Sequence, residues 1–271
     1  MENKIILAFA LTLFAGLATG IRSLIALLAK RTDTKFLSVS LGFSAGVMVY
    51  VSMAELFAEA KNSLSAFYGD KPGSLAAVLA FFGGIALIAV IDRLVPDYEN
   101  PHELHTVEEM EKPDLQNHQH DKRLMRTGTF TALVLAIHNF PEGIATFMSG
   151  LQDISIGIPV AFAVALHNIP EGIAVSVPVF YATGDRKKAF KFSFLSGLAE
   201  PLGALIAFLI LRPFLNPSVS GITFAAVAGI MVFISLDELL PSAREYGRHH
   251  LAIYGFIAGM AVMAFSLLMF A

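Results

Sequence analysis

The chain lacks cysteine and is poor in charge, and both absences exclude classes of protein. None of its 271 residues is cysteine, so it has no disulfide framework and offers no thiolate ligand to a metal. Charged residues make up 15% of the chain, against about 25% in soluble globular domains. The formal net charge of −3 says nothing about nucleic acid. We therefore do not expect a protein built mainly for water.

Apolar residues gather in blocks, and the mean hydropathy of the whole chain is +0.66. Each block is long enough for a transmembrane helix, which needs about 20 apolar residues. The pattern predicts an all-α membrane protein with eight transmembrane helices in one polytopic domain, residues 1–271. The predicted spans are 5–29, 36–57, 74–95, 127–148, 155–181, 191–211, 219–240 and 251–271.

Lysine and arginine are distributed unevenly between the two sets of connections. Fourteen of them follow predicted spans one, three, five and seven, whereas the other side holds only Lys4, Lys61, Lys71 and Arg212. Because positive loops stay in the cytoplasm, both termini are predicted to lie outside it. We expect a multi-pass protein of the cell inner (plasma) membrane.

The longest connection, 96–126, is predicted to be a mobile cytoplasmic loop. It is acidic and low in hydrophobicity, which argues against a packed core. It also carries four histidines, His102, His105, His118 and His120. One interpretation is a solvated linker, and the other is a segment that binds transition metals weakly, as His-rich tracts do.

A ten-residue segment, Ala136–Ala145, recurs 29 residues later as Ala165–Ala174. Both copies contain His-Asn-x-Pro-Glu-Gly within long apolar runs. Ionisable groups at membrane depth are rare and mark ion or proton pathways. Because the connection between the two predicted spans is short, the helices should be antiparallel neighbours whose motifs face each other. Imidazole, amide oxygen and carboxylate together suit divalent ions such as Zn²⁺, Fe²⁺ or Mn²⁺.

Prolines and a third glutamate add to this pattern. Pro141 and Pro170 should kink their helices, since proline lacks an N–H and clashes with the preceding turn. Glu200 stands at the middle of predicted span six, again followed by proline. Three carboxylates at one depth would repel each other unless a cation or protons neutralised them. A two-ion centre with a bridging carboxylate is consistent with this composition, and a purely structural role for the motifs is the alternative.

Other polar residues indicate a pathway to and from this centre. Glu55 and Glu59 lie at the outer end of predicted span two, and Asp92 lies at the inner end of span three. Asp237 and Glu238 end span seven on the inside. The alternative for such charges is a solvated helix end. Met48, near the middle of span two, has a thioether that could bind a transition metal, although methionine in an apolar helix usually serves packing.

The paired motifs in predicted spans four and five, with Glu-Pro in span six, closely resemble the ZIP family of divalent metal transporters. The resemblance covers essentially the whole chain. It implies a binuclear mid-membrane centre, uptake into the cytoplasm, and an elevator-type motion of one helix group against another. A homodimer rests on the resemblance alone. The implied metal ligands are His138, Asn139, Glu142, His167, Asn168, Glu171, Glu200 and, as in some relatives, Met48.

We expect uptake of divalent transition-metal cations, chiefly Zn²⁺ and also Fe²⁺, Mn²⁺, Co²⁺ and Cd²⁺, with the lipid bilayer as the other partner. The cations are cargo, and no prosthetic group or nucleic acid is expected. An intramembrane metalloprotease would need His-Glu-x-x-His, which the chain lacks, so we do not expect an enzyme. The alternative function is a proton-coupled carrier of an organic solute, whose buried carboxylates titrate rather than bind metal.

Overall fold

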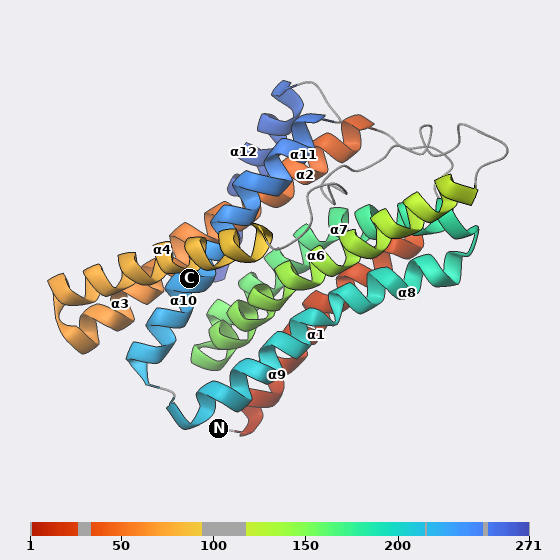
Figure 1. The fold of residues 1–271 in the computed structure, drawn as a ribbon. Coiled ribbons are helices and arrows are strands. Elements are labelled where there is room, and N and C mark those ends of the chain that lie inside the picture. The colour runs from red at the N-terminus through yellow and green to blue at the C-terminus, as the bar shows by residue number, and fades with distance from the viewer. Residues whose placement is uncertain (1, 27–33, 94–117, 215, 246–248, 271) are drawn as a thin grey trace.

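The computed structural model describes residues 2–26, 34–93, 118–214, 216–245 and 249–270, and these ranges are helical almost throughout (Figure 1). Two of the short elements, η1 and η4, are π-helices, and η3 is a 3-10 helix. The elements are α1 (Glu2–Ala26), α2 (Thr34–Val51), η1 (Ser52–Leu56), α3 (Phe57–Tyr68), α4 (Asp70–Arg93), α6 (His118–Gln152), α7 (Ile154–Thr183), α8 (Arg186–Gly197), α9 (Ala199–Leu211), η3 (Arg212–Phe214), α10 (Pro217–Ile234), η4 (Ser235–Leu239), α11 (Leu240–Glu245) and α12 (His249–Phe270).

Within these ranges, six helical segments are long and apolar enough to cross a membrane, judged by length and composition. They lie in α1, α2 to α3, α4, α8 to α9, α10 to α11, and α12. Helices α6 and α7, of 35 and 30 residues, also exceed the roughly 20 residues that a bilayer core requires. The predicted all-α architecture with several membrane-length helices is confirmed. The number of crossings and their direction stay predictions.

The helices form two groups that lie side by side in Figure 1. We call α1, α6, α7, α8 and α9 the motif group, because α6 and α7 carry the repeated motifs and pack along each other. The frame group contains α2, η1, α3, α4, α10, η4, α11 and α12, in which α2 packs on α12 and α10 packs on α3 and α4. The two groups meet where α7 contacts α2 and α12, and where α6 contacts α10.

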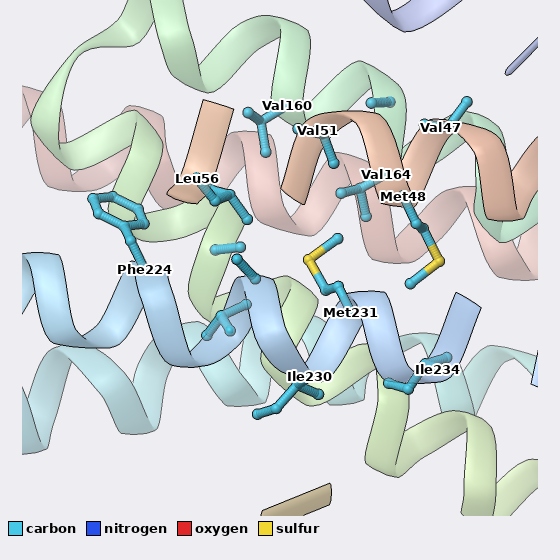
Figure 2. Close-up of a cluster of buried hydrophobic side chains, with 14 of the residues drawn as sticks. Val47, Met48, Val51, Leu56, Val160, Val164, Phe224, Ile230, Met231 and Ile234 are labelled. Atoms are coloured by element: carbon cyan, nitrogen blue, oxygen red, sulfur yellow. The ribbon is translucent and has the colours of Figure 1, made fainter. Parts of the chain in front are cut away.

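Apolar side chains fill much of the boundary between the groups. Figure 2 shows Met48 and Val51 of α2 close to Val160 and Val164 of α7 and to Met231 of α10. All five side chains are almost completely buried and belong to one apolar cluster. Burial of this surface within the protein, together with dense van der Waals contact, holds the groups against each other.

Glycines allow the closest backbone contacts, and these contacts stay within a group. A Cβ on Gly143 would overlap the backbone of Glu200 in α9, and one on Gly46 would overlap the carbonyl oxygen of Phe256 in α12. For every described glycine with neighbours this near, the overlapping atoms belong to its own group. Small residues allow such approach in membrane proteins, where lipid supplies no hydrophobic drive for association. The helix backbones therefore approach each other more closely at glycines within each group than they do between the two groups.

The prolines differ in their effect on helix continuity. α6 runs through Pro141 and α7 through Pro170 without an interruption of the helix. Pro201 follows a break, because α8 ends at Gly197 and α9 begins at Ala199. Because Pro201 has no N–H to donate to the carbonyl of Gly197, a helical bond is lacking where the two helices separate. Of the three, the proline after Glu200 separates two helices.

Two helical segments run beyond the predicted spans. Predicted span 36–57 lies within a longer helical segment that continues through η1 and α3 to Tyr68. Helix α6 begins at His118, so residues 118–126 are helical rather than part of the predicted loop. Residues 94–117, with His102 and His105, lie outside the described residues, as do the side chains of His118 and His120. Weak metal binding by this segment stays a prediction.

Two π-helices share a sequence pattern and carry three of the predicted pathway carboxylates. η1 reads Ser52-Met53-Ala54-Glu55-Leu56, and η4 reads Ser235-Leu236-Asp237-Glu238-Leu239. Each π-turn inserts an extra residue into an otherwise α-helical path, and such turns occur frequently at functional sites. The pattern Ser-x-x-Glu-Leu thus marks both places where a frame helix changes its winding.

Asp153 forms the turn between α6 and α7. Its carboxylate accepts hydrogen bonds from the backbone N–H of Ser155 at 2.8 Å and from the Ser155 hydroxyl at 2.7 Å. These bonds, led by that from the backbone, hold the pKa of the Asp153 carboxyl below its usual value. The cap ends α6 and starts α7 within a few residues, and the predicted antiparallel arrangement of these neighbours is confirmed.

Adjacent glycines of α4 offer a matched test of the close contacts. A Cβ on Gly84 would overlap the carbonyl oxygen of Ala226 in α10, whereas one on Gly83 would meet nothing within 4 Å. We expect Gly84→Ala to destabilise the protein by about 1–3 kcal/mol through overpacking. Gly83→Ala should be neutral or stabilising by up to about 1 kcal/mol, because alanine favours the helix. Thermal unfolding in detergent measures both, and equal effects of the two variants would contradict the close contact.

Candidate metal site

The predicted site residues with described side chains are largely buried and come from three helices. α6 contributes His138, Asn139 and Glu142, α7 contributes His167 and Asn168, and α9 contributes Glu200 in its first turn. None of these six residues is more than 3% exposed. The backbone of Glu171 lies in α7, but its side chain lies outside the described part of the structure.

The centre of the arrangement is a direct contact between the two motifs. His167 Nε2 lies 2.9 Å from Glu142 Oε1, and both side chains are essentially inaccessible to solvent. The other imidazole nitrogen, Nδ1, lies 3.2 Å from the carbonyl oxygen of Ala163. A proton on Nδ1 donated to that carbonyl would leave Nε2 with its lone pair, the tautomer that a metal requires. The other Glu142 oxygen, Oε2, is buried and has no hydrogen-bond partner among the described residues.

The two motif asparagines are held in the same way. Asn139 Nδ2 donates to the carbonyl of Ser196 in α8 at 3.2 Å. Asn168 Nδ2 donates to the carbonyl of Ala15 in α1 at 2.9 Å and to the carboxylate of Glu200. The amide oxygen of each asparagine is buried and has no partner among the described residues. Because the Nδ2 atom of each asparagine is held by a hydrogen bond, the amide oxygen has a fixed direction and remains available as an acceptor.

His138 pairs across the group boundary, which sequence reasoning did not predict. Its Nε2 lies 2.8 Å from Glu238 Oε1 in η4, and the two side chains are 4% and 6% exposed. His138 and Glu142 are four residues apart and so lie on the same side of α6, but this spacing does not identify a partner in the frame group. The one signal in the sequence is the position of Glu238 at the inner end of predicted span seven.

A second polar contact between the two helix groups, from Ser44 to His167, was also not predicted from the sequence. Ser44 of α2 donates from its hydroxyl to the backbone carbonyl of His167 at 3.3 Å. Little in the sequence indicated this contact, since a lone serine in an apolar helix is common. It positions α2 beside the motif of α7.

The remaining pathway candidates are spread along the frame group. Glu59 accepts hydrogen bonds from Gln152 of α6 at 2.6 Å and from Ser63 at 2.9 Å. Glu55 is half-buried in η1, and Asp92 is half-buried near the end of α4. Asp237, next to Glu238 in η4, is exposed.

Met48 is completely buried, and Figure 2 shows its side chain near Val164 and Met231. This environment fits the packing interpretation of Met48. Its role as a metal ligand stays untested.

Among the described side chains, no three of the His, Asp and Glu residues come together as a metal-binding group. The imidazoles and carboxylates instead form pairs, His167 with Glu142 and His138 with Glu238. The pairs and the amide oxygens are buried donor atoms of the kinds that bind borderline divalent ions.

The residue pattern can be compared with known proteins. The family model described as "ZIP Zinc transporter" matches residues 94–267. The chain belongs to the ZIP family. It is 66% identical to the zinc transporter ZupT of Oceanobacillus iheyensis over 273 residues, with 100% of both chains covered.

Other ZupT relatives are almost as similar to this ZIP family member. It is 61% identical to that of Clostridium perfringens, covering 99% of this chain and 97% of the relative, and 62% identical to that of Streptococcus mutans, covering 100% of both. The expected family and the expectation of a transporter rather than an enzyme are confirmed.

The His167–Glu142 contact predicts a coupled effect on stability. Replacing either residue by leucine should destabilise the metal-free protein by about 1–3 kcal/mol, because the partner is left buried without its hydrogen bond. The double variant should lose less than the sum of the two single losses, since it leaves neither group stranded. Thermal unfolding in detergent with a chelator measures the cycle. Strictly additive losses would show that the two side chains do not interact.

Proposed function

We propose that this protein takes up Zn²⁺ across the inner membrane into the cytoplasm. The observation that carries the proposal is the buried group around α6 and α7. There, Glu142 Oε2 and the amide oxygens of Asn139 and Asn168 have no hydrogen-bond partner among the described residues. Buried acceptors without donors are destabilising, and a cation that accepts their lone pairs offsets that cost. Zinc is the first choice because the relatives are zinc transporters.

The proposed centre is binuclear, and its ligands come from both motifs and α9. The set is His138, Asn139, Glu142, His167, Asn168, Glu171 and Glu200. His167 Nε2 and Glu142 Oε1 contact each other in this structure. An arriving cation would replace that contact with bonds to both groups, so the buried carboxylate would exchange the imidazole for the cation as its partner. Met48 is proposed as an additional ligand through its thioether.

The pathway is proposed to run from Glu55 and Glu59 to the centre and leave past Asp237 and Glu238, with Asp92 nearby on the inner side. The contact of His138 with Glu238 supports this route. It connects a proposed ligand of the centre to a proposed carboxylate of the exit, so the two side chains that would bind the cation in succession are already in contact.

Selectivity is proposed to be broad. The site has nitrogen and oxygen donors and no thiolate, and such sites accept several first-row ions. We propose that Fe²⁺, Mn²⁺, Co²⁺ and Cd²⁺ are also carried. Membership of a metal-transporter family favours this over the alternative, a proton-coupled carrier of an organic solute.

The proposed membrane arrangement has eight spans, with both termini outside the cytoplasm. Its support is the excess of lysine and arginine in one set of connections. A homodimer is proposed on the family resemblance.

Uptake into proteoliposomes that contain a zinc-sensitive dye tests the function. The native protein should give saturable Zn²⁺ influx, and Glu142→Ala and His167→Ala should lower the rate at least tenfold, since each removes a ligand. His250→Ala, which removes a histidine at the exposed start of α12, is the matched control and should transport normally. Influx of protons without any divalent cation would support the organic-solute carrier, and native-like influx in both site variants would show that the motifs are structural.

The absence of cysteine makes the membrane orientation directly measurable. Ser155→Cys, in the first turn of α7, should react in intact cells with a maleimide that cannot cross membranes. Lys187→Cys, in the first turn of α8, should react only after permeabilisation. Both native residues are exposed, so accessibility differs only by the side of the membrane. The reverse labelling pattern would place the termini in the cytoplasm.

A further inference from the structure

One face of α6 continues in polar residues beyond the motif. Thr146 lies four residues after Glu142 and Ser149 lies seven residues after it, so both are on the Glu142 side of the helix. Thr146 also lies seven residues after Asn139, so it is on the same side of α6 as both Asn139 and Glu142. With a rise of about 1.5 Å per residue, Thr146 lies about 6 Å and Ser149 about 10 Å along the axis from Glu142. The series ends at Gln152, the last residue of α6.

The hydroxyls of Thr146 and Ser149 are buried and lack partners. Thr146 is 0% exposed and Ser149 is 1% exposed. Neither hydroxyl oxygen has a hydrogen-bond partner among the described residues. A buried polar group without a partner is destabilising, so its presence at two successive turns needs an explanation.

Several helical hydroxyls elsewhere in the chain behave differently. Thr12, Thr183, Thr223 and Ser235 each donate to the carbonyl four residues earlier, at 2.7–2.9 Å. This local bond is the usual way in which serine and threonine are satisfied within a helix. Thr146 and Ser149 sit in the same kind of helix but do not form it, which leaves their oxygens available to another ligand.

The outer end of this face meets a carboxylate. Gln152 donates to Glu59 of α3 at 2.6 Å, and Ser63 donates to the same oxygen at 2.9 Å. At the other end lies Glu142, with one oxygen on His167. Thr146 and Ser149 therefore lie between two carboxylates on the outer half of α6, a stretch otherwise flanked by apolar cluster residues such as Phe147 and Met148.

We propose that the Thr146 and Ser149 hydroxyls are cation-contacting residues of the outer pathway, and this inference rests on the proposed function. Their neutral oxygens replace water molecules of a divalent cation as it passes from Glu59 to Glu142. A neutral oxygen binds a divalent ion more weakly than a carboxylate does, so these two positions shed water from the ion without trapping it. In this structure both side chains are buried away from solvent.

The test compares variants that remove only the hydroxyl. Thr146→Val keeps the shape of the side chain, Ser149→Ala removes one oxygen, and Thr146→Ser keeps the hydroxyl and serves as rescue. Thr12→Val is the matched control, because Thr12 is equally buried but its hydroxyl bonds the carbonyl of Ala8. Initial rates of Zn²⁺ influx into proteoliposomes give kcat and KM. Thermal unfolding and equilibrium Zn²⁺ binding in detergent complete the comparison.

We expect Thr146→Val and Ser149→Ala to lower kcat/KM for Zn²⁺ about fivefold to tenfold each, as loss of about one hydrogen-bond-strength contact would. Their melting temperatures should be equal to or higher than that of the native protein, because an unsatisfied buried hydroxyl has been removed. Equilibrium binding at the centre should be unchanged, Thr146→Ser should transport at near-native rate, and Thr12→Val should transport normally.

Two outcomes would overturn the inference while leaving the proposed function intact. One is native kcat/KM in both Thr146→Val and Ser149→Ala alongside an inactive Glu142→Ala, which would mean that the hydroxyls are tolerated packing atoms. The other is lost transport that accompanies a lowered melting temperature and is not rescued by Thr146→Ser, which would indicate a structural role. Absence of Zn²⁺ influx in the native protein would overturn the proposed function and this inference together.

Discussion

The cost of a carboxylate inside an apolar interior governs the arrangement of this protein. Glu142 is fully buried, and His167 from the neighbouring helix is a partner of its carboxylate. That contact fixes how α6 and α7 lie along each other. Close contact at Gly143 brings the backbone of Glu200 to the same level, and Asn168 then bonds its carboxylate. The donors of this region are largely used on backbone and carboxylates, which leaves several acceptor oxygens without a donor among the described residues.

The two helix groups differ in how they are held internally and across their boundary. Glycine contacts join backbones within each group, whereas apolar side chains such as Met48, Val164 and Met231 meet between them. Polar contacts cross the boundary at separate levels: Gln152 with Glu59, Ser44 with the carbonyl of His167, and His138 with Glu238. Displacement of one group against the other would exchange these hydrogen bonds while leaving the glycine contacts intact.

Much of the fold and of the candidate site could be predicted from the sequence, because both depend on strong local patterns. Long apolar blocks indicated the membrane-length helices, and the repeated motif indicated the residues that meet across α6 and α7. The helix ends were less predictable, as at Tyr68 and His118, because a helix can extend into polar sequence. The His138–Glu238 contact could not be derived, since it depends on how the two groups pack. Nor could the sequence show that the Thr146 hydroxyl has no partner among the described residues, because a threonine in an apolar helix normally bonds its own backbone.

The π-turns have a consequence for how carboxylates are aimed. In η1 and η4 the chain contains one residue more than an α-helix of the same path would need. Each extra residue rotates the remainder of the helix by about 100° relative to the turns before it. The direction of Glu238 toward His138 therefore depends on the number of residues in the turn as well as on their identity. A deletion of one residue there would restore regular α-helical bonding and leave every charge in the chain, yet point the acid away from its histidine.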